Sequence, residues 1–327
     1  MNELKKHKAA IIVSAIILIA AIVAVAVIPS VLRRAEISNQ FEIAQQYLND
    51  LDYESALLAF TRILEIDPKN VEARKALQDT YLAYIRTELA AGNTDHANKL
   101  LEQMRDALDI SNGMCGDLAI WTLDDGTLTI AGEGITYDYG TQVGVHDQPW
   151  YEYCSQITKV IIADGITELG WYNFNNCSNL KDVVIADSLI SLGRGTFVNC
   201  TSLKKISIPD SVTFIGWDVF FKCSSLSDVK LSENLQHIGW HAFFECTDLE
   251  SIVIPASVSE IGKNCFKGCS DLKTVYFYGS VPNFDSGEFH ETHSDLTLRY
   301  VDGTSGWTTP TWTAPDGTVY TTAIITP

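Results

Sequence analysis

The sequence predicts a multidomain chain of α and β structure: a transmembrane helix, short all-α hairpins, and then a solenoid of 23-residue coils closed by β caps. Three observations predict it. An apolar run lies near the N-terminus, apolar residues at helical spacing follow it, and several residue types then recur every 23 positions. The expected boundaries are 1–34 for tail and anchor, 35–110 for a helical stalk, 111–153 for an N-terminal cap, 154–277 for the solenoid and 278–327 for a C-terminal β cap.

The anchor is predicted from residues 9–28, where only Ser14 is polar. A helix rises about 1.5 Å per residue, so this run matches a bilayer core of about 30 Å. A short basic leader before an apolar run is typical of an uncleaved signal anchor, so we expect a single-pass protein of the cell membrane with a cytoplasmic N-terminus and an extracellular bulk. A cleaved secretion signal is the alternative, because Ala24-Val25-Ala26 has the small residues that a signal peptidase accepts.

The chain is acidic, with 23 Lys or Arg against 41 Asp or Glu and a net charge of −18. Such a surface repels nucleic acid and anionic lipid, so we expect no nucleic-acid partner. Eight cysteines in 327 residues are too few for a small disulfide scaffold.

Residues 35–110 have apolar residues at three and four spacing, interrupted at Asp50-Leu51-Asp52, Asp67-Pro68 and Gly92-Asn93. Five positions resemble a tetratricopeptide repeat: Ala44, Tyr47, Ala56, Phe60 and Pro68. A second repeat from Val71 has Tyr81 in register, but Ala97 and Leu101 arrive seven residues late. Two repeats are too few for a concave peptide groove, so we interpret this segment as a spacer or a self-association module.

The second half of the chain repeats with a constant step. One column is cysteine, at Cys154, Cys177, Cys200, Cys223, Cys246 and Cys269. An aromatic stands three residues earlier, at Tyr151, Phe174, Phe197, Phe220, Phe243 and Phe266. A Leu-Gly or Ile-Gly pair recurs from Leu169-Gly170 to Ile261-Gly262, as expected for a bend after a short strand. Each period therefore predicts one coil, and coils stack in parallel.

Both ends of this array depart from the period. Residues 115–150 contain a hairpin pattern, Trp121 to Ile130, in which Asp125-Gly126 favours a tight turn. After Phe277 we interpret the period as lost, and the Thr-, Trp- and Gly-rich stretch to Pro327 predicts a β cap.

The segment Ile208-Pro-Asp-Ser-Val-Thr-Phe-Ile-Gly216, followed by Phe220 and Cys223, resembles the BspA-type leucine-rich repeat family. This resemblance implies a right-handed solenoid, usually displayed on bacterial surfaces, with some members adhering to host proteins. A fold transfers between members of a family, whereas a particular ligand does not.

The cysteine column admits three interpretations: metal ligands, disulfides or buried packing. One thiol per coil gives a ladder and not a convergent metal site, and parallel side chains in register rarely reach the disulfide dihedral, so packing is favoured. The position after the bend glycine mixes aromatic and cationic residues, which favours exposure. We call it, with its neighbours, the candidate stripe: Trp171, Tyr172, Arg194, Trp217, Trp240, His241 and Lys263. The alternative is that its rings lie on one another and only cover the bend.

No serine elbow, phosphate loop or HExxH motif is present, so we expect no enzyme and no cofactor. His290 and His293 have neither helical spacing nor a third ligand nearby, which argues against metal. The favoured function is binding of a protein or glycan by the solenoid, in adhesion or another interaction. The alternatives are an envelope scaffold assembled by the helices with the solenoid as spacer, and a C-terminal carbohydrate module suggested by Asp285, Glu288, Asp302, Trp307 and Trp312.

Overall fold

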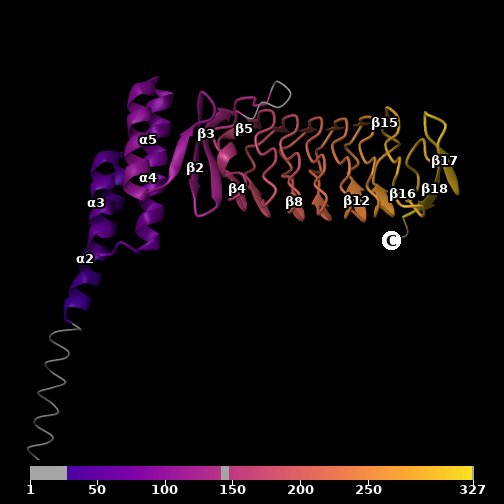
Figure 1. Ribbon diagram of the computed structural model, residues 1–327. Coiled ribbons are helices and arrows are strands. Elements are labelled where there is room, and N and C mark those ends of the chain that lie inside the picture. Colours follow the sequence, from indigo (N-terminus) through magenta and orange to yellow (C-terminus); the bar gives the residue numbers. More distant parts are fainter. Residues whose placement is uncertain (1–27, 141–146, 326–327) are drawn as a thin grey trace, which may run out of the picture. The chain divides into compact units, whose positions relative to one another are not determined.

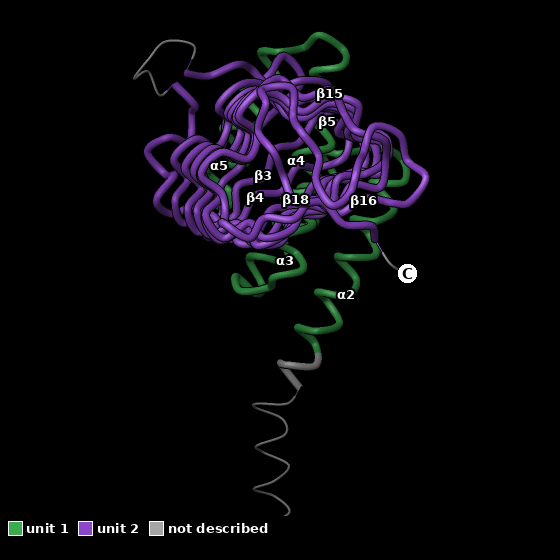
Figure 2. Tube along the Cα trace, turned by 90° about the vertical axis from the view of Figure 1, so that its right-hand side faces the viewer, with its two compact units in different colours: residues 1–109 green, residues 110–327 purple. Residues whose placement is uncertain are grey.

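The computed structural model describes residues 28–140 and 147–325 and consists of two compact units, Met1–Asp109 and Ile110–Pro327 (Figures 1 and 2). All but the last residue of the predicted membrane span at 9–28 lies outside the described residues. Among the helices that are described, none combines the length and apolar character needed to cross a bilayer.

From residue 28 onward the first unit holds four helices, α2 (Ile28–Asn49), α3 (Tyr53–Ile66), α4 (Val71–Ala90) and α5 (Thr94–Leu108), and each contacts the next. Two of these helices have a polar N-cap residue, because its side chain accepts a hydrogen bond from an otherwise unpaired N–H group of the first turn. Asp52 accepts from Ser55 N at 3.1 Å, and Asn70 accepts from Ala73 N at 2.9 Å. Helix α4 runs for 20 residues, from Val71 to Ala90, and Ala97 and Leu101 lie in the helix after it, α5.

The second unit is a β-solenoid of about seven turns. The first strands of the coils form one row of parallel strands: β4 (Lys159–Ile162), β6 (Asp182–Ile185), β8 (Lys205–Ser207), β10 (Asp228–Lys230), β12 (Ser251–Ile254), β14 (Thr274–Phe277) and β16 (Thr297–Tyr300). Within this row β4 pairs with β6, β8 with β10, and β12 with β14 and then β16. The other row is formed by the second strands: β5 (Ile166–Leu169), β7 (Ser191–Leu192), β9 (Phe214–Ile215), β11 (His237–Ile238), β13 (Glu260–Ile261) and β15 (Asn283–Phe284). Paired residues differ by 23, as in Lys159 with Asp182 and His237 with Glu260. The predicted coil is therefore confirmed.

The phenylalanine column fills the interior. Phe174, Phe197, Phe220, Phe243 and Phe266 are fully buried, with successive ring centroids 5.2–5.6 Å apart. The cysteines are buried free thiols beside them. From Cys200 onward each thiol donates to the carbonyl of the phenylalanine 26 residues earlier, as in Cys223 to Phe197 O at 3.1 Å. The column thus combines packing with a hydrogen bond between coils.

The glycine of the Leu-Gly or Ile-Gly pair is required for close packing of neighbouring coils, whereas we expected it from the sequence to form the bend itself. A Cβ on Gly193 would lie 2.3 Å from Leu169 O of the preceding coil, so the residue permits close approach of two backbones. The left-handed backbone comes two residues later, in a column with φ of 54° to 71°: Tyr172, Gly195, Asp218, His241, Asn264 and Gly287. A second such column, with φ of 55° to 78°, comprises Asn176, Asn199, Lys222, Glu245, Gly268 and Glu291.

The N-terminal end is closed by antiparallel strands β1 (Ser111–Met114), β2 (Leu118–Asp124) and β3 (Thr127–Ile135). Asp125 and Gly126 both have positive φ, 43° and 72°, as a type I′ hairpin requires. Strand β3 pairs first with β4 and then with β5, so both rows of parallel strands start from it. The ring stacked on Phe174 is that of Trp150 and not the expected Tyr151, which lies in a 3-10 turn, Tyr151–Tyr153, and is exposed.

The period continues beyond Phe277, contrary to our interpretation of the sequence. Strand β16 pairs with β14 at the same step of 23, and Phe289 stacks on Phe266 at 5.5 Å. The last coil escaped notice because Asp285 replaces its glycine and Thr292 its cysteine. Strands β17 (Thr311–Thr313) and β18 (Val319–Ile324) then close the end, with Trp307, Trp312 and Tyr320 buried over the core.

Candidate functional site

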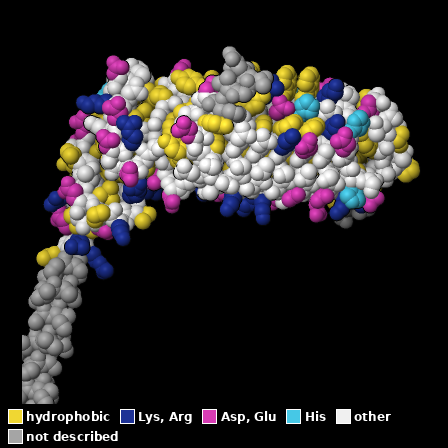
Figure 3. Space-filling view, in the orientation of Figure 1, with side chains coloured by type: hydrophobic (Ala, Val, Ile, Leu, Met, Phe, Trp, Pro, Cys, Tyr) yellow, Lys and Arg dark blue, Asp and Glu magenta, His cyan; other side chains and the backbone are white. Residues whose placement is uncertain are grey.

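The candidate stripe lies on the surface. Five of its residues directly follow the bend glycine, and the other two, Tyr172 and His241, are left-handed residues one position later. Trp171, Trp217 and Trp240 are 42%, 43% and 43% exposed, in contrast to the fully buried rings three residues later in each coil. Figure 3 shows hydrophobic side chains interspersed with His, Lys or Arg, and Asp or Glu along one edge of the solenoid.

The two central tryptophans stack on each other, with ring centroids 4.9 Å apart and planes at 7°. Trp240 Nε1 also donates to Asp285 Oδ2 at 2.7 Å, and its ring covers Gly262. The two rings therefore stack on each other, as expected in the alternative of rings that only cover the bend, but they remain nearly half exposed. Each is fixed in orientation, which lowers the entropy that a bound partner would cost it.

Arg194 joins the stripe into one network. Its Cζ lies 5.7 Å from the centroid of the Tyr172 ring and 5.8 Å from that of Trp217, within reach of cation–π attraction. Its Nε lies 3.1 Å from Asp218 Oδ2, and Asp218 Oδ1 lies 3.2 Å from His241 Nδ1. Burial raises the pKa of Tyr172, so its hydroxyl stays protonated at neutral pH.

The two ends of the stripe are less connected. The backbone N–H of Lys263 donates to Asp285 Oδ2 at 3.2 Å, while its side chain is exposed. The backbone N–H of Trp171 donates to Asp138 Oδ1 at 2.8 Å. Across residues 28–140 and 147–325 no ring contact is found for Trp171.

Sequence reasoning missed a second exposed column three residues before the stripe, on the outward face of the second strands: Glu168, Ser191, Phe214, His237 and Glu260. Phe214 is 40% exposed and stacks on His237 at 4.9 Å. His237 Nδ1 lies 3.1 Å from Glu260 Oε2. The 23-residue step itself was the signal that could have found this column.

A hollow of about 230 Å³ lies between the two columns. It is lined by Glu168, Trp171, Ser191, Leu192, Gly193, Arg194, Phe214, Gly216 and Trp217. Phe214 and the stripe thus border one shared depression.

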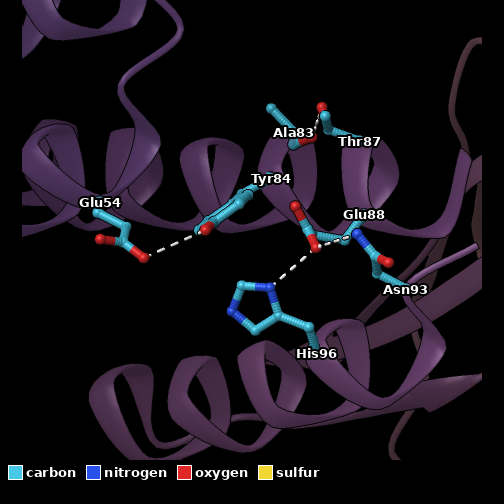
Figure 4. A network of polar contacts seen from close by, with 7 residues as sticks. All are labelled: Glu54, Ala83, Tyr84, Thr87, Glu88, Asn93 and His96. Atoms are coloured by element: carbon cyan, nitrogen blue, oxygen red, sulfur yellow. Dashed lines mark hydrogen bonds and ion pairs between the residues drawn. The ribbon is translucent and has the colours of Figure 1, made fainter. Parts of the chain in front are cut away.

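The helical unit has a larger cavity of about 700 Å³ between α3, α4 and α5. At its wall Tyr84 stacks on Tyr53 at 5.2 Å and donates to Glu54 Oε1 at 3.3 Å (Figure 4). Glu88 accepts from Asn93 at 3.0 Å and lies 2.9 Å from His96 Nδ1, and these hydrogen bonds lower the pKa of Glu88. Leu58, also in the lining, is 72% exposed.

The C-terminal residues suggested as a carbohydrate module do not form an open site. Trp307 and Trp312 are each 8% exposed, and Trp307 packs on Phe277 at 4.6 Å. Glu288 is buried, and Asp285 is engaged by Trp240. These aromatic rings close the core, and a sugar could not stack on them.

The structure offers little for redox or metal chemistry. Burial raises the pKa of the Cys223 and Cys269 thiols to about 12, so both stay protonated and unreactive. His290 lies 3.6 Å from Asp316 and His293 lies 3.9 Å from Asp295. Within the described part of the chain, no group of three or more His, Cys, Asp or Glu could hold a metal ion.

Comparison with known proteins identifies the repeat. Residues 147–273 match the family described as BspA type leucine rich repeat region, in six copies. No curated protein sequence matches the chain.

Similar solved structures are leucine-rich repeat proteins. The T. pallidum protein TpLRR is 26% identical, with a TM-score of 0.42 over 56% of this chain and 86% of that one. A leucine rich cell surface protein from Faecalibacterium prausnitzii A2-165 is 24% identical, with a TM-score of 0.34 over 59% and 71%. The pneumococcal vaccine antigen PcpA is 18% identical, with a TM-score of 0.40 over 57% and 44%. The repeat region of this chain, residues 147–273, is therefore similar to the BspA-type leucine-rich repeat family.

Proposed function

We propose that this protein is a non-enzymatic, membrane-anchored surface protein that binds another protein through the candidate stripe. Leucine-rich repeat proteins of this kind typically mediate interaction or adhesion. The observation that carries the proposal is the exposed, stacked pair Trp217 and Trp240, held by Arg194 and Asp285 on a rigid scaffold. Tryptophan and arginine dominate the binding energy of protein interfaces, and fixed rings lose little freedom on binding.

A protein partner is favoured over a glycan by the way the rings lie. A sugar ring stacks on the open face of an aromatic ring. Trp217 and Trp240 cover each other's inner faces, Arg194 lies over the Trp217 ring, and Trp240 lies against Gly262. Ring edges, a guanidinium and carboxylates remain outward, and these suit the mixed side chains of a protein surface.

Binding is tested by photo-cross-linking in intact cells. p-Benzoylphenylalanine replaces Trp217 in one variant and Lys230, an exposed strand residue away from the stripe, in a matched control. We expect one discrete heterologous protein adduct at position 217 and none at 230. Equal adducts at the two positions, or none at 217, would contradict the proposal.

The membrane anchor and the outward orientation rest on the apolar run at residues 9–28 and its basic flanks. Protease shaving of intact cells tests them, with one antibody to the solenoid and one to an N-terminal tag. Loss of the solenoid signal with a protected tag is expected. A solenoid that stays protected until the membrane is broken would contradict surface display.

The cavity of the helical unit favours a second candidate, an envelope scaffold that assembles through α2–α5. Leu58, in the lining of this cavity, is 72% exposed and offers apolar surface to a second copy of the chain. Photo-cross-linking at Leu58 distinguishes the candidates, because a scaffold yields adducts of two copies of the chain while position 217 yields none.

A further inference from the structure

We propose that the 230 Å³ hollow receives one aromatic side chain of the partner protein, with a neighbouring Lys or Arg of that partner paired to Glu168. This inference rests on the proposed function and specifies its partner: a protein surface that presents an aromatic residue beside a basic one.

The hollow exists because one coil has no ring in either exposed column. The coils on both sides carry an aromatic there: Trp171 before it, and Phe214 with Trp217 after it. The intervening coil carries Ser191 and Arg194 instead. Ser191 pairs in register with Glu168 on one side and Phe214 on the other, so its small side chain leaves space at that rung.

The spacing suits one inserted ring. Adjacent coils lie about 4.8 Å apart, and Phe214 stacks on His237 of the next coil at 4.9 Å. On its other side Phe214 pairs in register with Ser191, which carries no ring. A ring inserted at the level of Ser191 would lie about 4.8 Å from Phe214, in the range of favourable aromatic pairs, and would extend that stack beside the Arg194 guanidinium that lies over the Trp217 ring.

The size limits the occupant to a single side chain. Pockets for drug-sized ligands measure roughly 300–1,000 Å³, whereas this hollow measures about 230 Å³. Its lining includes Leu192 and Gly193 together with the exposed aromatic residues of the neighbouring coils. An interface hot spot has this form, with one aromatic anchor in a shallow pocket.

The charge at its rim selects a basic neighbour. Arg194 is already engaged by Asp218 at 3.1 Å and by two rings. Glu168 is exposed, and no ion-pair partner is found for it in the segments 28–140 and 147–325. The chain as a whole carries a net charge of −18, which also attracts a basic partner.

The test uses three capped tripeptides as probes: Lys-Trp-Lys, Lys-Leu-Lys and Glu-Trp-Glu. The purified full-length chain carries 5-fluorotryptophan at all seven tryptophans, and single Trp→Phe variants assign the ¹⁹F resonances. We expect Lys-Trp-Lys to shift the Trp171 and Trp217 resonances saturably and to leave those of Trp307 and Trp312 unchanged. The other two peptides should bind at least tenfold more weakly.

Ser191→Phe fills the hollow from within, because the new ring can stack on Phe214 as His237 does. Asn283→Phe is the matched control, a neutral residue of the same column four coils away. We expect at least a tenfold loss of Lys-Trp-Lys affinity in the first variant and less than a twofold change in the second. If Ser191→Phe does not fold, Glu168→Lys replaces it, and should weaken Lys-Trp-Lys at least fivefold while strengthening Glu-Trp-Glu.

The inference is overturned if Lys-Leu-Lys binds as tightly as Lys-Trp-Lys, if no saturable shift occurs at Trp171 and Trp217, or if both Phe variants behave alike. Its failure differs from failure of the proposed function. If Ser191→Phe still yields the heterologous adduct at position 217, the stripe binds a protein without using this hollow.

Discussion

Two aromatic residues only three positions apart have opposite roles in the same coil. Phe220 is fully buried between the rings of Phe197 and Phe243, whereas Trp217 is 43% exposed and stacks on Trp240. The difference arises from the left-handed residue Asp218 between them, which turns the chain inward. Phe220 therefore contributes mainly to stability, whereas Trp217 is available for binding.

Phe220→Ala should lower the free energy of unfolding by about 3–5 kcal/mol, because it leaves a cavity in a column of stacked rings. Trp217→Ala should cost about 1 kcal/mol or less, since much of its surface is already in water. Guanidinium denaturation of the two variants measures both values. Equal losses would contradict the assignment of these columns to core and surface.

Glu288 gives the core a pH dependence. Its carboxyl is buried, and burial raises its pKa to about 7 from an ordinary value near 4.5. The folded chain then holds a proton that the unfolded chain has released, so stability falls as pH rises from about 4.5 to 7 and is level above that.

Glu288→Gln should remove this dependence, because the amide stays neutral. Its melting temperature relative to the parent should therefore rise between pH 5 and pH 8. Asp302→Asn, at an exposed acid of the same end of the chain, is the control and should show no such trend. A constant difference between parent and Glu288→Gln across this range would contradict the buried, protonated carboxyl.

At the scale of the element, backbone geometry decides what the coil tolerates. Each coil contains two left-handed positions, and the residues there include Tyr172, Lys222, Glu245 and His241, which rarely adopt that conformation. The N–H of the residue at the first position donates to a carbonyl of the next coil, as in Asp218 to Trp240 O at 2.8 Å. Stacking of the coils imposes the conformation against the residue's own preference.

Lys222→Gly should therefore be neutral or stabilise the fold by up to about 1 kcal/mol, because glycine adopts positive φ without strain. Lys230→Gly is the matched control in strand β10, where glycine should cost about 0.5–1 kcal/mol. Thermal denaturation of both variants shows whether each substitution raises or lowers the stability. Destabilisation by Lys222→Gly beyond that of Lys230→Gly would contradict the argument.

The sequence predicts which residues of successive coils share a column, but it does not predict the backbone conformation within a coil. The regular step of Phe and Cys predicts which residues share the interior, because burial selects residue type. The left-handed columns have no such marker, since Asn, Asp, Lys, Glu, Tyr and His alternate there. The exposed Phe214 column and the hollow at Ser191 follow from the same step once the strand positions are known.

At the scale of the whole molecule, each coil contacts its two neighbours, so stability should be close to a sum over coils. Deleting residues 208–230 removes one period and joins Ser207 to Leu231, which takes the place of the buried Ile208. We expect this variant to fold, with lower stability and a smaller denaturant m-value. Deleting residues 208–229 should instead abolish cooperative unfolding, because it places Lys230 at that buried position and reverses every following side chain.

The ends of the array were harder to predict than its middle. Beyond Phe277 the glycine and cysteine markers are replaced by Asp285 and Thr292, although Phe284 and Phe289 keep the step. At the start, a 3-10 turn moves Trp150 into the place expected for Tyr151. A terminal coil has no neighbouring coil on one side, so its residue types are determined by the need to cap the core and not by the repeat.

The constant step also governs how such a surface can change with time. A duplication of one repeat in the coding sequence keeps both the reading frame and the strand register, and adds one rung to each exposed column. Substitution at a rung leaves the neighbouring rungs in place, because the interior of each coil is unchanged. The binding surface can therefore be extended or altered one coil at a time, while the residues that stabilise the fold stay constant.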